Sequence, residues 1–163
     1  MNQPIIYEYT PQHKAALLDL LLKLQVDYFK KTVTPQQQEL SKAKDDRKAF
    51  SDYITFMERQ PQDWKILLAI AEADKVVGFI IGSITTDDDL ELSPIGKIED
   101  WFVEEEYRKG GVGGKLYTEL ENWFKAQGCQ QVLSDTWMDN TLSIDVHKQL
   151  GFFVTGIQFG KKL

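Results

Sequence analysis

The residues with the clearest chemical potential in this chain lie in one short loop. Four of the five residues from Gly110 to Gly114 are glycine, and the cations Arg108, Lys109 and Lys115 flank them. An apolar stripe with helical spacing begins at once, so the loop opens a helix. The first amides of a helix have no intrahelical partner and carry partial positive charge, and glycines let an anion approach them closely. The loop therefore predicts a phosphate site.

The spacing of the loop excludes two common phosphate motifs. A P-loop needs Ser or Thr after its lysine, whereas Leu116 follows Lys115. A dinucleotide loop needs G-x-G-x-x-G after the first strand of a parallel sheet, whereas these glycines come late in the chain and follow a predicted antiparallel hairpin. The residues from Arg108 to Gly113 instead match the pattern R-x-x-G-x-G. The alternative is a glycine turn that only lets the helix pack close to its strand.

Three carboxylates lie on the strands predicted to flank this loop and its helix. Glu99 and Asp100 precede the loop, and Asp135 follows the helix. Adjacent residues of a strand face opposite sides, so Glu99 and Asp100 enter one cleft only if a bulge intervenes. Carboxylates of this kind can act as general bases. Pairing with a lysine is the structural alternative.

The elements that must position these groups follow from periodicity and turn residues. The predicted order is β-α-α-β-β-β-α-β-α-β, an α+β domain with one β-α-β crossover around the glycines and a parallel or splayed strand pair. A single domain of residues 1–163 is expected. Helices are expected to begin at Thr10-Pro11, Thr34-Pro35, Val112 and Thr141, and strands are expected at 5–9, 65–73, 76–85, 95–103, 131–136 and 152–159. The second helix has a possible capping box with Gln37, carries Ala43, Phe50, Ile54 and Met57 on its apolar side and should end before Pro61. The apolar stripe of the third helix is Val112, Leu116, Leu120 and Trp123.

Composition excludes several classes of protein. The net charge of −6, from 25 acidic and 19 basic residues, argues against a nucleic-acid binder. The single Cys129 rules out an intramolecular disulfide and has no evident metal partner. Residues 1–10 do not resemble a signal peptide, and no apolar run is long enough to span a bilayer. We therefore expect a cytoplasmic protein without a metal, nucleic-acid or membrane partner.

Three separated motifs in the correct order resemble the GNAT superfamily of acyl-CoA-dependent N-acetyltransferases. The first is the loop from Arg108 to Gly113, similar to the pyrophosphate loop of that family. The second, from Ile98 to Val103, is similar to its bulged fourth strand. The third is Asn140 with His147 and Leu150-Gly151-Phe152, which is similar to an Asn…Tyr-x-x-Leu-Gly-Phe ending. The resemblance covers about residues 64–160 and implies acetyl-CoA as co-substrate, with no metal.

The resemblance also implies roles for individual residues. His147 stands where the family usually has a tyrosine that protonates the leaving thiolate. Because histidine replaces tyrosine here, it stays open whether His147 is the acid or only lines the site. The base is expected among Glu99, Asp100 and Asp135, and Asn140 should cap its helix and touch the cofactor. The expected cofactor-binding residues are Trp101, Phe102, Val103, Arg108, Lys109, Gly110, Gly111, Val112, Gly113, Gly114 and Asn140.

The substrate expectation comes from two subfamily resemblances. The segment from Glu99 to Arg108 looks like the polyamine acetyltransferases, and the segment from Ser134 to Phe152 looks like the 6′-type aminoglycoside acetyltransferases. Both imply acetylation of a primary amine of a small cationic substrate by direct attack in a ternary complex. A protein N-terminal or lysine acetyltransferase, and a non-catalytic acyl-CoA sensor, remain the alternatives. Many relatives are dimers, so a homodimer is one expected arrangement, which the sequence itself does not determine.

Overall fold

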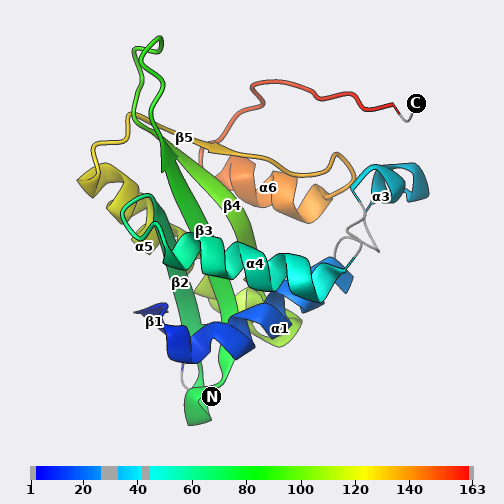
Figure 1. Cartoon of the computed structure of the whole chain (residues 1–163), viewed down its shortest axis with the longest axis vertical. Helices are drawn as coiled ribbons and strands as arrows, with labels where there is room; N and C mark the ends of the chain where they lie inside the picture. The colour runs from blue at the N-terminus through cyan, green and yellow to red at the C-terminus, as the bar shows by residue number, and fades with distance from the viewer. Residues whose placement is uncertain (1–2, 27–32, 42–44, 162–163) are drawn as a thin grey trace.

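The computed structural model describes residues 3–26, 33–41 and 45–161, which contain a five-stranded sheet (Figure 1). Neighbouring strands are antiparallel except β4 and β5, which are parallel and joined through a helix. This arrangement confirms the α+β class and the predicted crossover. In spatial order the strands are β1 (Ile5–Glu8), β2 (Trp64–Ile70), β3 (Val76–Thr85), β4 (Ile95–Val103) and β5 (Gln131–Ser134).

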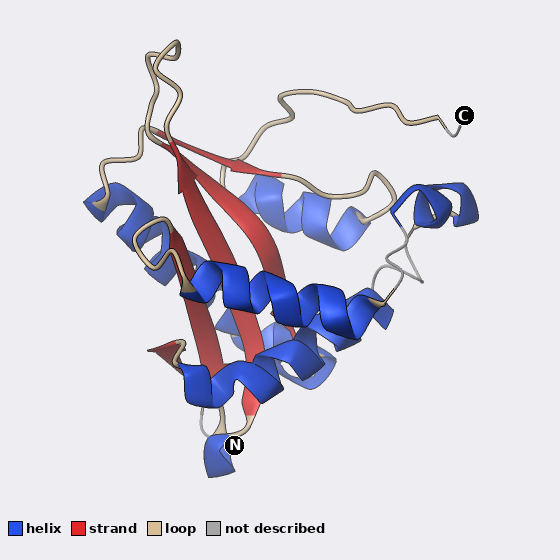
Figure 2. Cartoon of the chain, viewed as in Figure 1, coloured by secondary structure: helices blue, strands red, loops and turns tan. Residues whose placement is uncertain are grey.

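Helices pack on both faces of this sheet (Figure 2). One face carries α1 and α4, and the other carries α5, which connects β4 to β5. The helices are α1 (Lys14–Leu24), α3 (Pro35–Ser41), α4 (Asp46–Glu58), α5 (Val112–Ala126) and α6 (Thr141–Gln149), with short 3-10 turns η1 (Pro11–His13), η3 (Glu72–Asp74) and η4 (Glu105–Gly110).

Alternation along the strands divides the apolar residues between two cores. On β3, Phe79 and Ile81 pack with residues of α1 and α4, whereas Val77 and Ile80 pack with residues of α5. Successive side chains of a strand point to opposite faces, which explains the division of Phe79, Ile80 and Ile81. Val77 departs from this alternation because the register between β2 and β3 shifts beside it, where Ala69 pairs with Gly78 and Ile70 with Val76. We call these the α4 face and the α5 face of the sheet.

Helix α5 is held close to the sheet by glycines beneath it. The predicted stripe places Trp123 in the core, but Trp123 is only half-buried and Phe124 is the fully buried residue. A Cβ on Gly82 or Gly96 would lie 2.7–2.8 Å from side-chain atoms of Leu120 or Phe124. The missing side chains on β3 and β4 therefore make room for the Phe124 ring.

The single helix expected from Thr34 to before Pro61 is wrong, because the structure has two helices there. The capping box between Thr34 and Gln37 is present at the start of α3, with hydrogen bonds of 2.7 and 3.4 Å. Asp45 then adopts an extended conformation and its side chain accepts a hydrogen bond from the Lys48 amide, which begins α4 as a new helix. Ala43, expected on the apolar side of that helix, lies outside the described residues.

The closing strand expected at Phe152–Phe159 is also wrong. In the described part of the chain these residues pair with no strand, and the segment runs across the molecule toward α3 (Figure 1). Phe152 is partly buried, but the side chains after it are exposed, 83% for Phe153 and 91% for Phe159. Aromatic and β-branched residues favour extended backbone, but a strand forms only where a partner edge is available.

Candidate active site

The site is organised by a bulge in β4. Asp100 pairs with Ile81 and Ile98 pairs with Gly82, so Glu99 has no partner on β3. An extra residue in one strand shifts the alternation of side chains. Glu99 and Asp100 consequently point to the same face, the α4 face, whereas Ile98 and Trp101 pack on the α5 face. The bulge is the condition under which both carboxylates enter one cleft.

A lysine links the carboxylates on this face. Lys97 Nζ lies 3.0 Å from Glu99 Oε2 and 3.4 Å from Asp135 Oδ2, and Ser83 Oγ donates a 2.5 Å hydrogen bond to Glu99. Hydrogen bonding to Glu99, followed by the charges of Glu99 and Asp135, raises the pKa of Lys97. The Asp135 side chain is 82% exposed, so this carboxylate remains open to a cationic ligand. The three predicted carboxylates therefore lie together.

Asp100 is the carboxylate with the strongest electrostatic perturbation. Burial raises the pKa of Asp100 to about 6, and the nearby charges of Glu99 and Asp135 act in the same direction. The Tyr53 hydroxyl, which reaches it from α4, donates a hydrogen bond that favours the charged form and opposes this rise. Burial and the two carboxylates Asp100 and Glu99 hold the pKa of Tyr53 well above its usual value, so it remains a donor. Asp100 is thus a carboxyl group with a pKa just below neutral pH, the range that suits a general base.

The parallel strands diverge at this bulge. Strands β4 and β5 pair only from Ile95 to Ile98 opposite Gln131 to Ser134. Strand β4 continues to Val103, and within the described residues it has no partner on its β5 side beyond the bulge. On this side the backbone groups of residues 100–102 therefore have no strand partner and can hydrogen-bond an extended ligand, and a cofactor bound there stays a prediction.

On the α5 face, His147 of α6 lies beside this divergence. Its Nε2 is 2.8 Å from Ser134 Oγ, and its Nδ1 is 2.7 Å from the carbonyl oxygen of Ser143. The ring contacts Trp101 and Phe152 edge-on, with centroids 6.4 and 5.2 Å apart. His147 and the carboxylates are therefore on opposite faces of the sheet, with the divided strand pair between them.

The glycine loop has the properties of an anion site. The turn η4 leads to Gly111, whose φ of 77° requires a residue that tolerates the left-handed region. No side chain caps the first amides of α5, unlike those of α4 and α6, which Asp45 and Asn140 cap. A Cβ on Gly110, Gly111 or Gly114 would meet nothing within 4 Å. Uncapped amides beside open space fit the pyrophosphate of acetyl-CoA.

Gly113 differs from the other loop glycines. A Cβ there would lie 3.3 Å from the Trp101 ring. The Trp101 ring also stacks on Tyr117 of α5, with a centroid separation of 6.0 Å. Gly113 therefore serves the close packing of α5 against β4, which was the structural alternative for the whole loop.

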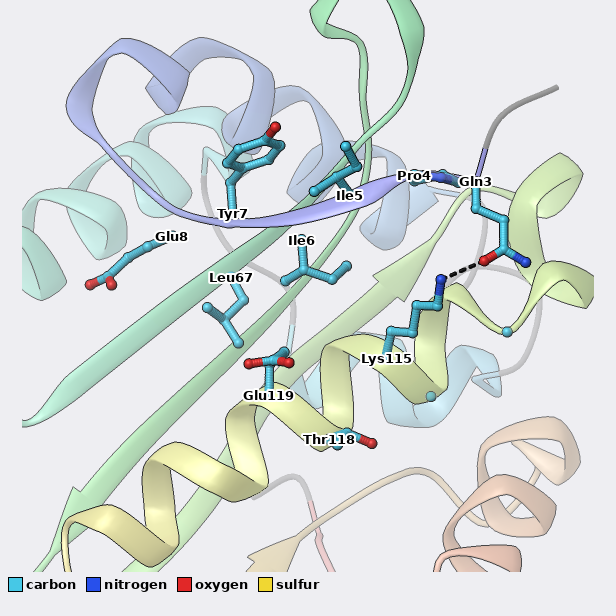
Figure 3. Close-up of a pocket in the computed structure, with 12 residues that line it drawn as sticks. Gln3, Pro4, Ile5, Ile6, Tyr7, Glu8, Leu67, Lys115, Thr118 and Glu119 are labelled. Atoms are coloured by element: carbon cyan, nitrogen blue, oxygen red, sulfur yellow. Dashed lines mark hydrogen bonds between the residues drawn. The ribbon is translucent and has the colours of Figure 1, made fainter.

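The three cations near the loop have different orientations. Arg108 Nε donates a 2.8 Å hydrogen bond to the Val103 carbonyl, and its guanidinium lies over the Phe102 ring. Lys115 bonds to Gln3, beyond β1, and not to the loop (Figure 3). Lys109 is exposed. Lys109 and the outer part of Arg108 are thus the groups suited to a phosphate, and the expected contribution of Lys115 is not supported by its position.

The other expected cofactor residues are mostly buried. The side chains of Phe102, Val103 and Val112 belong to the two cores, so they can offer a ligand only their backbone. Asn140 caps α6 as predicted, its Oδ1 accepting from the Ser143 amide at 2.9 Å. Its Nδ2 donates to Thr136 at 2.7 Å. Its contact with the cofactor stays a prediction.

A groove beside the glycine loop shares two residues with the predicted pyrophosphate site, because Gly111 and Gly114 are among the residues that line it. Figure 3 shows this groove. It lies between β1 and the first turns of α5, and Ile5, Tyr7, Lys115 and Glu119 are among its lining residues. None of the three carboxylates and neither Ser134 nor His147 borders it. The groove therefore adjoins the predicted pyrophosphate site but does not reach the carboxylates or His147.

Three residues of the site escaped prediction. Tyr53, Ser83 and Ser134 contact the predicted groups through pairings between distant segments, and no local pattern marks them. Ser134 alone carried a hint, because it precedes Asp135 at the end of a strand. Among the described residues no cluster of His, Cys, Asp and Glu could hold a metal ion, and no helix is long and apolar enough to cross a membrane.

Curated relatives carry one repeated name. Over 86 residues the chain is 38% identical to an aminoglycoside N(6′)-acetyltransferase type 1 of Salmonella typhimurium, which covers 51% of this chain and 59% of that relative. Over 91 residues it is 31% identical to an enzyme of the same name from Acinetobacter genomosp. 13, covering 55% and 62%. The chain thus matches about six tenths of the length of these relatives.

Solved structures extend the likeness of the fold to the whole chain. An aminoglycoside antibiotic 6′-N-acetyltransferase of Acinetobacter haemolyticus has a TM-score of 0.75 at 24% identity, covering 100% of this chain and 99% of that one. A complex of AAC(6′)-Iy with the bisubstrate analogue CoA-S-monomethyl-acetylneamine has a TM-score of 0.70 at 25% identity, covering 99% of each. The model of the acetyltransferase (GNAT) family matches residues 19–152, a segment that contains the bulge, the glycine loop, Asn140 and His147. The chain therefore belongs to the GNAT acetyltransferase family.

Proposed function

We propose that this protein transfers the acetyl group of acetyl-CoA to a primary amine of a small polycationic acceptor of the aminoglycoside type. The observation that carries the proposal is the bulge at Glu99, which brings Glu99 and Asp100 to the α4 face beside Asp135, at the point where β4 and β5 separate. A cationic amine is attracted to these carboxylates. The matched relatives, named as aminoglycoside N(6′)-acetyltransferases, support the same acceptor class.

In this proposal the carboxylates of the α4 face act on the acceptor, whereas the start of α5 and the edge of β4 bind acetyl-CoA. On the α4 face, Glu99 and Asp135 bind cationic groups of the acceptor, and Asp100 takes the proton that the attacking amine must lose. The pKa of Asp100, raised to about 6 by burial, leaves this carboxylate ionised at neutral pH and still basic enough to act. The bound acetyl-CoA supplies the activated acetyl group. The amides at the start of α5 hold its phosphates, and the free edge of β4 aligns its extended arm.

The acceptor is tested with matched substrates. One aminoglycoside bearing a 6′-amino group is compared with its 6′-hydroxyl counterpart, a linear polyamine, a lysine analogue and a peptide N-terminus, with acetyl-CoA consumption as the measurement. We expect acetylation of the 6′-amine and no reaction of the 6′-hydroxyl compound. The value of kcat/KM should fall as salt rises, because salt screens the attraction between the carboxylates and a polycation.

Variants of the carboxylates make the same test specific to the site. Asp135→Asn and Glu99→Gln should each lower kcat/KM for the polycation by about tenfold, equivalent to roughly 1.4 kcal/mol. Asp52→Asn, which changes an exposed carboxylate on α4 paired with Lys48, is the control and should leave kcat/KM unchanged. A preference for peptide or neutral amines without salt dependence would contradict the acceptor class. Acetyl-CoA binding without turnover of any amine would favour the acyl-CoA sensor.

We further propose that the protein acts in the cytoplasm as a homodimer. The support for the compartment is the single cysteine, Cys129, which is a free thiol. The support for the dimer is the apolar tail after Gly151, where Phe153, Ile157 and Phe159 are 83%, 67% and 91% exposed. Exposed apolar surface of this kind marks association sites. Sedimentation should give twice the chain mass for the full chain and a monomer after deletion of the tail.

A further inference from the structure

Both ring nitrogens of His147 are already engaged. Nδ1 faces two oxygens of Ser143, the carbonyl at 2.7 Å and the hydroxyl at 3.3 Å. We assign a proton to Nδ1 because the nearer oxygen, the carbonyl, can only accept. Nε2 is 2.8 Å from Ser134 Oγ, and in the neutral ring it accepts the proton of that hydroxyl. The edge-on contacts with Trp101 and Phe152 hold the ring in this orientation. Neither nitrogen is therefore free to reach a ligand directly.

The hydroxyl of Ser134, in contrast, lies where a ligand must pass. Ser134 is the last residue of β5 and pairs with Ile98, the residue before the bulge, so it marks the point of separation of the two strands. Its contact with His147 places its side chain on the α5 face, the face of Trp101. A hydroxyl has one donor and two acceptor positions, so Ser134 can hydrogen-bond to His147 and still form a second hydrogen bond with a ligand between the strands.

We propose that Ser134 is the residue that protonates the departing thiolate, with His147 behind it as a positioning residue and proton source. When the ring is protonated, Nε2–H donates to Ser134 Oγ and frees the hydroxyl proton to point between the strands. As the carbon–sulfur bond breaks with its electron pair on sulfur, the Ser134 O–H bond breaks and an S–H bond forms. Oγ takes the Nε2 proton, and the ring regains a proton from solvent before the next turnover.

This assignment rests on the proposed acetyl transfer and explains how a histidine can occupy the expected acid position without facing the sulfur. The competing explanation is that the Ser134–His147 hydrogen bond only ties α6 to β5. The two explanations predict different behaviour of the His147 ring when a ligand with or without a sulfur atom binds. A hydrogen bond that only ties α6 to β5 should not depend on the sulfur.

The first test needs binding alone. The ¹⁵N resonances of the His147 ring are recorded in the intact protein with CoA and with desulfo-CoA, which lacks the sulfur. We expect the free protein to show the Nδ1–H tautomer, CoA to shift the Nε2 resonance, and desulfo-CoA to bind with similar affinity but to leave Nε2 near its free position. In Ser134→Ala the response to CoA should disappear. Equal Nε2 shifts with CoA and desulfo-CoA would overturn the proposal.

The second test measures the single-turnover rate of acetyl transfer. Ser134→Ala should lower this rate at least about tenfold while the Kd for acetyl-CoA changes less than twofold, since general acids contribute about 10²–10⁴. Ser134→Thr, which keeps the hydroxyl, should retain most of the rate. Adding His147→Ala to Ser134→Ala should cost little more, because the two residues act in series. A wild-type rate in Ser134→Ala, or equal losses in the Ala and Thr variants, would refute the proposal.

The two tests also separate this proposal from the proposed function. If calorimetry shows that neither CoA nor desulfo-CoA binds, the acetyl-CoA assignment fails. If both bind and the ring does not distinguish them, only the role of Ser134 fails.

Discussion

Substitution of Gly114 by aspartate should raise the stability of the protein and weaken its binding of acetyl-CoA. Gly111 is the N-cap of α5, so Gly114 is its third helical residue, and a Cβ there would meet nothing within 4 Å. Aspartate is about 0.3 kcal/mol more favourable than glycine in a helix, since the two residues lie about 0.7 and 1 kcal/mol below alanine. A carboxylate in the uncapped first turn adds about 0.3–1 kcal/mol through the helix dipole. Together these effects predict a gain of about 0.6–1.3 kcal/mol, or a few degrees in Tm.

The same carboxylate competes with a phosphate for the same amides. A pair of like charges about 4 Å apart costs about 1 kcal/mol at the dielectric constant of water and about 4 kcal/mol at an effective value of 20. We therefore expect the Kd for acetyl-CoA to rise at least about fivefold, and less at high salt. Gly114→Ala is the control, because it adds the Cβ without the charge and should raise Tm while changing Kd much less.

Calorimetric titration and thermal unfolding measure the two effects in one preparation. The opposite signs matter, because a substitution that merely damaged the fold would lower both Tm and affinity. A Gly114→Asp protein with raised Tm and unchanged affinity would show that the phosphates bind elsewhere.

Three further changes test the charges and caps. Asp100→Asn should raise Tm above pH 6 but not at pH 4. The pKa of Asp100 in the folded protein, about 6, exceeds its value in the unfolded chain, so the free energy of unfolding falls by about 2 kcal/mol between about pH 4 and 6 as the buried carboxyl ionises. Equal Tm changes at both pH values would contradict this. Tyr53→Phe removes a hydrogen bond that favours the ionised form, so the acidic limb of kcat/KM should move to higher pH, and an unmoved limb would argue against Asp100 as the base. Asp45→Ala removes the cap of α4 and should cost about 1 kcal/mol in denaturant unfolding, against a few tenths for Asp52→Ala.

The open, uncapped start of α5 could be predicted because its determinants are local. Backbone amides at the start of a helix and glycines that leave them open are properties of consecutive residues, and the loop from Arg108 to Gly114 contains both. Caps are local in the same way, and Thr34 with Gln37 and Asn140 with Ser143 form the predicted hydrogen bonds. The local signal failed at Asp45, where an acidic residue within a polar stretch begins a new helix.

Features that depend on a partner in space were predicted less well. The apolar run from Phe152 to Phe159 has strand composition but no strand to pair with in the described chain. The direction of Lys115 depended on Gln3, at the far end of the sequence. Local composition contains no information about such distant partners.

The sequence by itself determined the family motifs, the candidate groups Glu99, Asp100, Asp135 and His147, and the order of the elements except for the divided helix after Thr34 and the missing last strand. Only the tertiary structure decided how these groups act together. The bulge that turns Glu99 and Asp100 to one face depends on the register between β3 and β4. The separation of the carboxylates from His147, and the contact between Ser134 and His147, depend on the pairing of β5 and the docking of α6. Register and docking are set by the packing of both cores at once, a property of the whole chain that no single segment encodes.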